Sequence, residues 1–103
     1  MQTYDLKSRN IGKGRAEVFH LSRKDEFACR LLQLDNGEEI PPSGLDSYII
    51  FVVITGKVKI TADEEEKIMS EGECMISSPA VMAMQAQKNT RILGIKINLC
   101  QED

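Results

Sequence analysis

The side chains that could carry chemistry are few in this sequence of 103 residues, and they do not cluster along it. His20 is the only histidine, and a single histidine cannot build a metal site, although it could shuttle a proton. Asp46, Tyr48 and Glu73 are candidate acids or bases, and Cys74 is a candidate nucleophile. No histidine lies near Cys74 in the sequence, so a buried, inert thiol is the simpler interpretation.

One acidic run, Asp63 to Glu66, could in principle attract a cation. Adjacent carboxylates in a turn have no fixed cage, and mobile carboxylates bind hard cations weakly. We therefore interpret this run as the solvated end of a hairpin.

The overall charge excludes some partners. The chain has 13 Lys and Arg against 16 Asp and Glu, a net charge of -3, and its basic residues are scattered rather than gathered on one face. This argues against nucleic acid, whose binding sites are basic patches. No apolar run approaches the roughly 18 residues of a membrane span, and the first residues lack the apolar centre of a signal peptide. We expect a cytoplasmic protein with no membrane partner.

The three cysteines, Cys29, Cys74 and Cys100, form no CxxC pair, and their number is odd. These features favour reduced thiols over a disulfide framework, in agreement with a cytoplasmic location.

The elements that must position these side chains are predicted to be about nine short strands. Turn signals separate them, among them Asp35-Asn36-Gly37, Gly56 and Lys88-Asn89. No segment has a helical period. Short strands at regular spacing are typical of an all-β sandwich or barrel. The expected strands are AEVFHL after Arg15, residues 27–34, 48–54 and 57–61, and the segments KIMS, CMIS, VMAMQAQ and RILGIKINL.

Two stretches are informative about burial. Tyr48 to Ile54 is apolar at every position, which predicts a central strand buried on both faces. Residues 57–61 alternate, which places Val58 and Ile60 inward. Pro41 and Pro42 precede these strands and cannot donate ladder hydrogen bonds, as is typical of a strand start or an edge.

The chain is short enough to form one domain. We divide it into residues 1–26, a polar arm with Gly12 and Gly14 followed by the first strand, and residues 27–103, the β-barrel. The arm is a candidate for dimer formation.

Over roughly residues 27 to 97, the order of turns resembles a single-domain cupin, the small double-stranded β-helix or jelly-roll barrel. Gly37 to Gly56 has the length and the terminal glycines of the first cupin motif. The second motif is similar to Gly72-Glu73-Cys74-Met75-Ile76 followed by Ser78-Pro79-Ala80-Val81. The resemblance implies an all-β, cupin-like double-stranded β-helix.

The residue types that bind the metal in cupins are absent from the ligand positions of these two motifs. The histidine and glutamate positions of the first motif fall on Ser43, Leu45 and Ile49, and the histidine of the second falls on Ala83. A first-row divalent cation will not leave water for such side chains. We therefore expect no metal and no other cofactor.

The same substitutions predict an apolar barrel interior. Leu45, Ile49 and Ala83 would line it together with Phe51 and Val53, and Ser43 and Gln85 would be its polar points. Either these side chains fill the barrel as an ordinary core, or they surround a pocket for a small, mainly apolar ligand. The candidate pocket residues are Ser43, Leu45, Ile49, Phe51, Ala83 and Gln85.

Outward-facing apolar residues suggest a partner surface. In this interpretation Met82 and Met84 have the opposite parity to Ala83 and face outward, as do Ile50 and Val52. An exposed apolar face needs a cover. Small cupins commonly dimerise, so we expect a homodimer.

Three functions remain open at this point. The first is a metal-free module that binds a small molecule or regulates a process, with a non-catalytic role favoured. The second is a metal-independent cupin enzyme acting on a small metabolite or sugar, as are the sugar-nucleotide epimerases of that superfamily. The third is a structural or interaction protein with a filled barrel.

Overall fold

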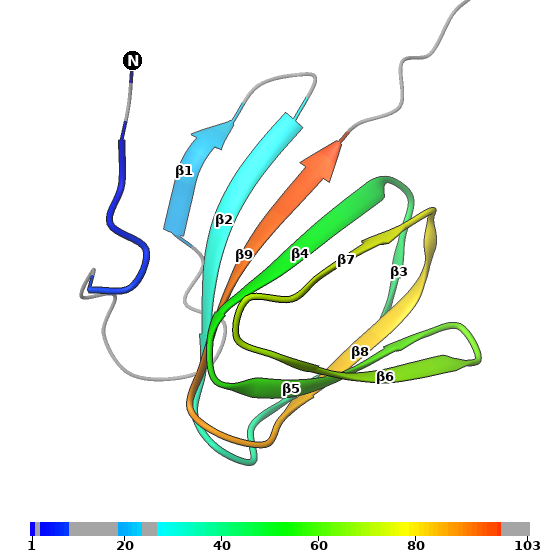
Figure 1. Ribbon diagram of the computed structural model, residues 1–103. Coiled ribbons are helices and arrows are strands. Elements are labelled where there is room, and N and C mark those ends of the chain that lie inside the picture. Colours follow the sequence, from blue (N-terminus) through cyan, green and yellow to red (C-terminus); the bar gives the residue numbers. More distant parts are fainter. Residues whose placement is uncertain (2, 9–18, 24–26, 98–103) are drawn as a thin grey trace, which may run out of the picture.

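The computed structural model describes residues 1, 3–8, 19–23 and 27–97, and residues 19–23 by their backbone alone. Predictions about Gly12, Gly14, the side chain of His20 and Cys100 lie outside these residues. Nine strands are described (Figure 1). They are β1 (Phe19–Arg23), β2 (Phe27–Leu34), β3 (Glu39–Leu45), β4 (Tyr48–Thr55), β5 (Lys57–Ala62), β6 (Glu65–Ser70), β7 (Cys74–Ser77), β8 (Ala80–Ala86) and β9 (Thr90–Ile97).

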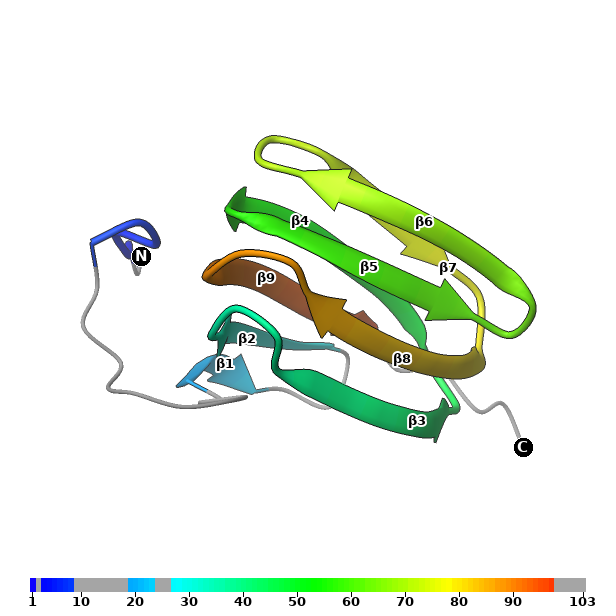
Figure 2. The same cartoon turned by 90° about the horizontal axis from the view of Figure 1, so that it is seen from below.

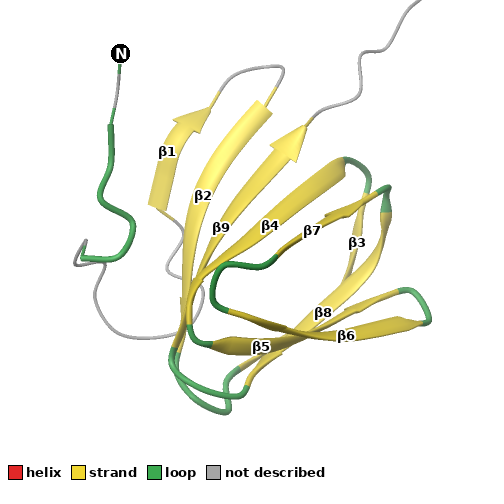
Figure 3. Ribbon diagram, viewed as in Figure 1, coloured by secondary structure: helices red, strands yellow, loops and turns green. Residues whose placement is uncertain are grey.

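The strands form two sheets that face each other (Figure 2). The five-stranded sheet has the order β1-β2-β9-β4-β7 and the four-stranded sheet the order β3-β8-β5-β6. Strand pairs within both sheets are antiparallel, and the described residues form only strands and loops (Figure 3). The all-β prediction is therefore confirmed. Within the same residues no helix is long and apolar enough to cross a membrane.

At one end of the sandwich, β2, β4 and β9 are joined to strands of the opposite sheet by tight turns. Gly37 and Gly56 have positive φ of 89° and 96°, which glycine adopts without steric cost. Hydrogen bonds tie these turns together: the Asn36 N–H donates to Asn89 Oδ1 at 2.8 Å, and the buried Thr90 Oγ1 donates to the Lys57 carbonyl at 3.0 Å. This end is closed by polar contacts between turns.

The hydrophobic core fills the space between the sheets. From β4 it takes Ile49, Phe51 and Val53, which are 1%, 4% and 1% exposed, as predicted. The outward Ile50 and Val52 of the same strand are only half-buried, so the prediction of burial on both faces holds for one face. From β5 the core takes Val58 and Ile60, again as predicted. A domain of this size stabilises its fold mainly by this burial of apolar surface.

Strand β8 has the opposite parity to the predicted one. Met82 and Met84 are buried in the core at 5% and 6% exposure, whereas Ala83 and Gln85 face outward. The pairing determines this result, because Met84 lies opposite Ile60 of β5, a core residue, and side chains of directly paired residues share a face. Since the larger apolar side chains gain more free energy from burial, the methionines take the inner face.

The two prolines lie within a strand rather than before one. Pro41 and Pro42 belong to β3, the edge of the four-stranded sheet, as the missing donors suggested. The register with β8 shifts between Ile40 and Ser43, so the prolines occupy a β-bulge. Because of this extra residue, Ile40 and Ser43 both face the interior although their numbers differ in parity.

Candidate functional site

A cavity of about 230 Å³ lies between the two sheets. It is on the side of the sandwich where β2 of one sheet and β3 of the other lie (Figure 2). Its wall is mainly apolar, with one cation and one hydroxyl. The residues that line it are Arg30, Leu32, Ile40, Ser43, Leu45, Phe51, Met82, Ala83 and Met84.

Gly94 of β9 makes room for this cavity. It lies between Arg30 of β2 and Phe51 of β4 in one cross-strand row. A Cβ atom at this position would lie 3.1 Å from Phe51 Cε1, closer than most real contacts, so the phenyl ring occupies the space above the glycine. The central strand therefore adds no side chain to the row, and Arg30 and Phe51 face a common space.

The structure brings together part of the predicted pocket. Ser43, Leu45 and Phe51 line the cavity. Ile49 is a core residue that does not line it. Ala83 borders the cavity between the two methionines, although its paired neighbour, the outward Thr61, places its Cβ on the outer face.

Gln85 lies on the other side of the sheet. It pairs with Glu39 and with Lys59 on the outer face, where a hollow of about 210 Å³ includes all three. The prediction that Gln85 is a polar point of the interior is wrong, for the same reason of β8 parity.

Sequence reasoning missed Arg30. The signal was present, because Arg30 alternates in β2 with Leu32 and Leu34, which are 5% and 0% exposed. A half-buried cation on the apolar face of a strand interrupts the core pattern, because charged side chains favour the surface. The cupin motif positions lie in β3, β4 and β8, so the motif comparison did not include β2.

The candidate acids, bases and nucleophile are not brought together. Asp46 and Tyr48 are exposed, and Tyr48 lies on the outer face of the five-stranded sheet. Glu73 Oε1 accepts a hydrogen bond from the Ser70 N–H at 2.7 Å, so this side chain closes a turn. Cys74 is exposed rather than buried. None of these residues lines the cavity, and the arrangement offers no acid and base pair there.

The acidic run is divided by the fold. Asp63 and Glu64 form the turn, whereas Glu65 and Glu66 begin β6 and, as neighbours in a strand, face opposite sides of it. The Oδ1 atom of Asp63 accepts a hydrogen bond from the Val81 N–H at 2.8 Å, which attaches the turn to β8. The carboxylates of the run thus point in different directions.

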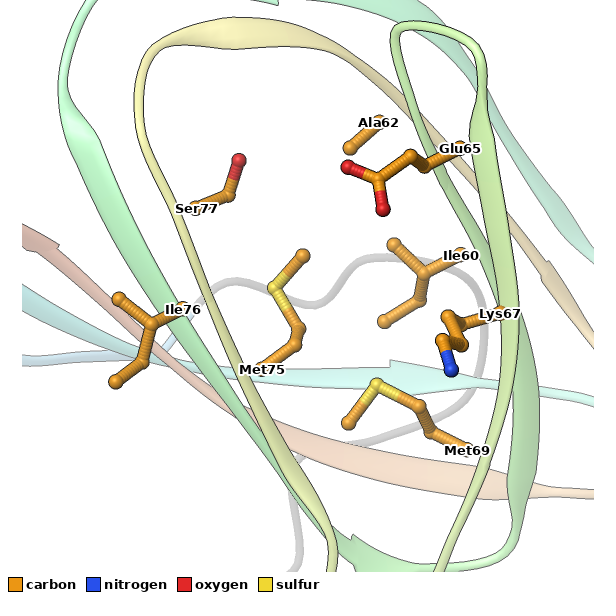
Figure 4. Close-up of a pocket in the computed structure, with 8 residues that line it drawn as sticks. All are labelled: Ile60, Ala62, Glu65, Lys67, Met69, Met75, Ile76 and Ser77. Carbon is orange, nitrogen blue, oxygen red and sulfur yellow. The ribbon is translucent and has the colours of Figure 1, made fainter.

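A second hollow, of about 140 Å³, opens on the opposite side of the sandwich between the edge strands β6 and β7 (Figure 4). Apolar side chains including Met69 and Met75 line it, with Glu65 and Lys67 from β6; Ile76 points away from it. It is smaller than the first cavity, and its opposite charges offset each other. The cavity beside β3 is therefore the better candidate site.

The residues at the cupin metal positions do not fit a metal. Ser43 offers one neutral hydroxyl, and Leu45, Ile49 and Ala83 offer no donor. Among the described residues, no group of three His, Cys, Asp or Glu side chains could hold a metal ion. No metal chemistry can be derived from this donor set.

The purified protein should be indifferent to chelators. A metal that binds the folded state at a hundredfold excess over its dissociation constant would raise the melting temperature by on the order of 10 °C. We expect no such difference between EDTA-treated protein and protein incubated with Zn²⁺, Mn²⁺ or Ni²⁺ in a thermal-shift assay. Stoichiometric metal in elemental analysis would contradict this prediction.

Comparison with known proteins places the fold. No protein-family model matches the chain, and no curated protein matches its sequence. A conserved protein of unknown function from Streptococcus pyogenes, SPY1581, is similar in structure with a TM-score of 0.82 at 17% identity; the match covers 97% of this chain and 90% of that one. An RmlC-like cupin protein from Desulfovibrio desulfuricans matches with 0.80 at 14% identity, over 94% and 96%.

A third structure, the Cnp3 cupin domain of Schizosaccharomyces pombe, matches with a TM-score of 0.81 at 18% identity, over 94% of this chain and 74% of that one. These likenesses span nearly the whole chain, with TM-scores of 0.80 to 0.82. The resemblance in the glycine and proline turns is therefore matched by the tertiary structure, and this chain is a small protein with the cupin fold.

Proposed function

We propose that the protein is a metal-free binding module whose cavity beside β3 holds a small molecule with an apolar body. The observation that supports it is the cavity itself: about 230 Å³ of space, walled by apolar side chains of both sheets, with few polar groups. Binding sites for small molecules are usually of this kind. For comparison, an apolar cavity of about 150 Å³ can hold benzene.

Three features favour binding over catalysis. The wall of the cavity is formed by side chains of paired β-strands rather than of loops, and sites on strands are held more precisely. Its lining contains no acid and base pair, and the candidate acids and bases lie elsewhere. A ligand would contact the apolar side chains of Leu32, Phe51 and Met82, which would remove its own apolar surface from water.

A bulky residue at the cavity mouth should abolish binding. Ser43 pairs with Met82 and faces the cavity, so Ser43→Phe would fill it. We expect the affinity for a small aromatic probe such as benzyl alcohol or benzoate, measured by calorimetry, to fall at least about tenfold because the phenyl ring takes the volume of the ligand. The melting temperature should change little, since Ser43 is exposed.

The matched control is Val81→Phe. Val81 pairs with Gly44, one position from Ser43, but faces outward and is 49% exposed. The Val81→Phe substitution adds the same phenyl ring on the outer face of the four-stranded sheet. Equal loss of binding in both variants, or no loss in Ser43→Phe, would argue against the cavity as the site.

We also propose that a second copy of the chain covers the outer face of the five-stranded sheet. Neighbouring strands place apolar residues on this face in rows: Ile76, Ile50, Ile95 and Cys29 form one of them. In the next row Tyr48, Ile97 and Phe27 are 43%, 39% and 36% exposed. Of the described β2, β4, β7 and β9 residues on this face, only Arg91 is charged.

The same apolar rows can face each other across a twofold axis, which supports a homodimer rather than a charged partner. Met82 and Met84 do not contribute to this surface, because they lie in the core.

A further inference from the structure

Two cations of the barrel interior need an explanation beyond the proposed function. Arg30 lines the cavity. Lys96 of β9 lies on the same inward face, because it pairs with Ile49 of β4, which is 1% exposed. Both side chains are half-buried. The inner face of a barrel therefore presents two positive charges where folding alone would favour apolar residues.

The register places the two cations near each other. Arg30 pairs with Gly94 and Lys96 pairs with Ala28, so the cations occupy diagonal corners of a square on neighbouring strands. Diagonal neighbours in an antiparallel pair have Cα atoms about 7–8 Å apart. The other two corners hold glycine and alanine, which leave room for the two long side chains.

Neither charge is neutralised within the described part of the chain. Neither the guanidinium of Arg30 nor the ammonium of Lys96 has an ion pair or hydrogen bond with it. Of the described residues that line the cavity, none is acidic. Two half-buried like charges on neighbouring strands repel each other, and an anion bound at Arg30 would reduce this cost.

We propose that the ligand is a small organic carboxylate, with its anionic group on Arg30 and its apolar body against Leu32, Phe51 and Met82. This inference rests on the proposed function, because it names the chemical class that the same cavity binds. Arginine pairs with a carboxylate through two parallel hydrogen bonds, a geometry that fixes the orientation of the ligand. Lys96, on the same inward face of the sheet, adds a second positive charge to this part of the barrel. A body about the size of a benzene ring or a six-carbon chain suits the volume.

Matched probes that differ only in charge test this assignment. Calorimetry would compare benzoate with benzamide, and hexanoate with hexanamide, on the full chain. We expect each carboxylate to bind at least about tenfold more tightly than its amide, because the charge-assisted pair forms only with the anion. Inorganic phosphate, an anion with no apolar body, should bind more weakly than either carboxylate.

Arg30→Gln should reduce the affinity for the carboxylates to that of the amides and leave the amides unchanged. Lys96→Gln should produce a smaller loss in the same direction. The control is Lys67→Gln, which removes a cation that faces the second hollow between β6 and β7. Arg30→Leu keeps an apolar stem and provides a second test if Arg30→Gln folds poorly.

The outcomes separate the two proposals. Equal binding of acids and amides, or an Arg30→Gln variant with undiminished preference for the acids, would overturn the carboxylate assignment and leave the binding module intact. Tight binding of inorganic phosphate would overturn the apolar part of the assignment. Binding of neither member of either pair would overturn the proposed function, and this assignment with it.

Discussion

Gly56→Ala should destabilise the fold by about 2–5 kcal/mol, the largest effect that we expect from a single methyl group in this chain. Gly56 has φ of 96°, and a side chain at positive φ costs roughly 1–2 kcal/mol. In addition, its Cβ would meet Asn89 O, Thr90 Oγ1 and Thr90 Cα, the last two at 2.5 and 2.7 Å. Two of these atoms are backbone and cannot move aside, so overpacking adds about 1–3 kcal/mol or more.

The measurements are denaturant unfolding and thermal unfolding, each followed by circular dichroism. For a domain of this size each 1 kcal/mol corresponds to roughly 4–8 °C, so the melting temperature should fall by on the order of 20 °C. Much of a typical free energy of unfolding, about 5–15 kcal/mol, would be lost.

Gly37→Ala is the matched control. Gly37 has nearly the same φ, 89°, but no atom lies within 4 Å of its Cβ position. It should therefore show the backbone cost alone, about 1–2 kcal/mol. If the two variants lose the same stability, the close packing of Gly56 against the turn before β9 is not what requires glycine there.

Ile76→Glu should convert the protein from a dimer to a monomer if the proposed self-association is right. Ile76 is 71% exposed and points outward from β7 (Figure 4), so the monomer tolerates a charge there with little change in stability. In the dimer that carboxylate would be desolvated against apolar rows without a partner. This costs several kcal/mol and should weaken dimerisation at least about a hundredfold.

Light scattering and sedimentation at micromolar concentration would measure the change. Ile68→Glu is the control, because Ile68 is 52% exposed but pairs with Lys59 on the outer face of the other sheet. If Ile68→Glu disrupts the dimer and Ile76→Glu does not, the interface lies on the four-stranded sheet, which contradicts the proposal. A wild-type monomer would overturn the self-association itself.

Much of the fold could be predicted from the sequence, because local chemistry determined it. Gly37 and Gly56 end strands at positive φ, as the turn signals predicted. The alternation of Val58 and Ile60 determined which face of β5 is buried, and the apolar run of β4 contained the inward residues Ile49, Phe51 and Val53. The glycine and proline spacing was sufficient to predict the cupin fold without any of the metal ligands.

Which face of β8 is buried could not be predicted from the local sequence. Residues 80–86 are small or apolar at nearly every position, so either face could have been buried. The pairing with β3 and β5 decides the matter, because it places Met84 opposite Ile40 and Ile60. The bulge at Pro41 and Pro42 adds a shift that no alternating pattern along β3 would predict.

Only part of the candidate site could likewise be predicted from the sequence. Ser43, Leu45 and Phe51 could be predicted because they lie in one motif and were all assigned to the inward face of their strands. Arg30 could not be associated with them, since β2 lies outside the motif and Arg30 faces Phe51 only across Gly94. The sequence by itself determined the turns, the strands and an apolar interior, because these depend on neighbouring residues. Only the tertiary structure decided that a cavity remains and that its wall carries a cation, because both depend on which strands pair and in what register.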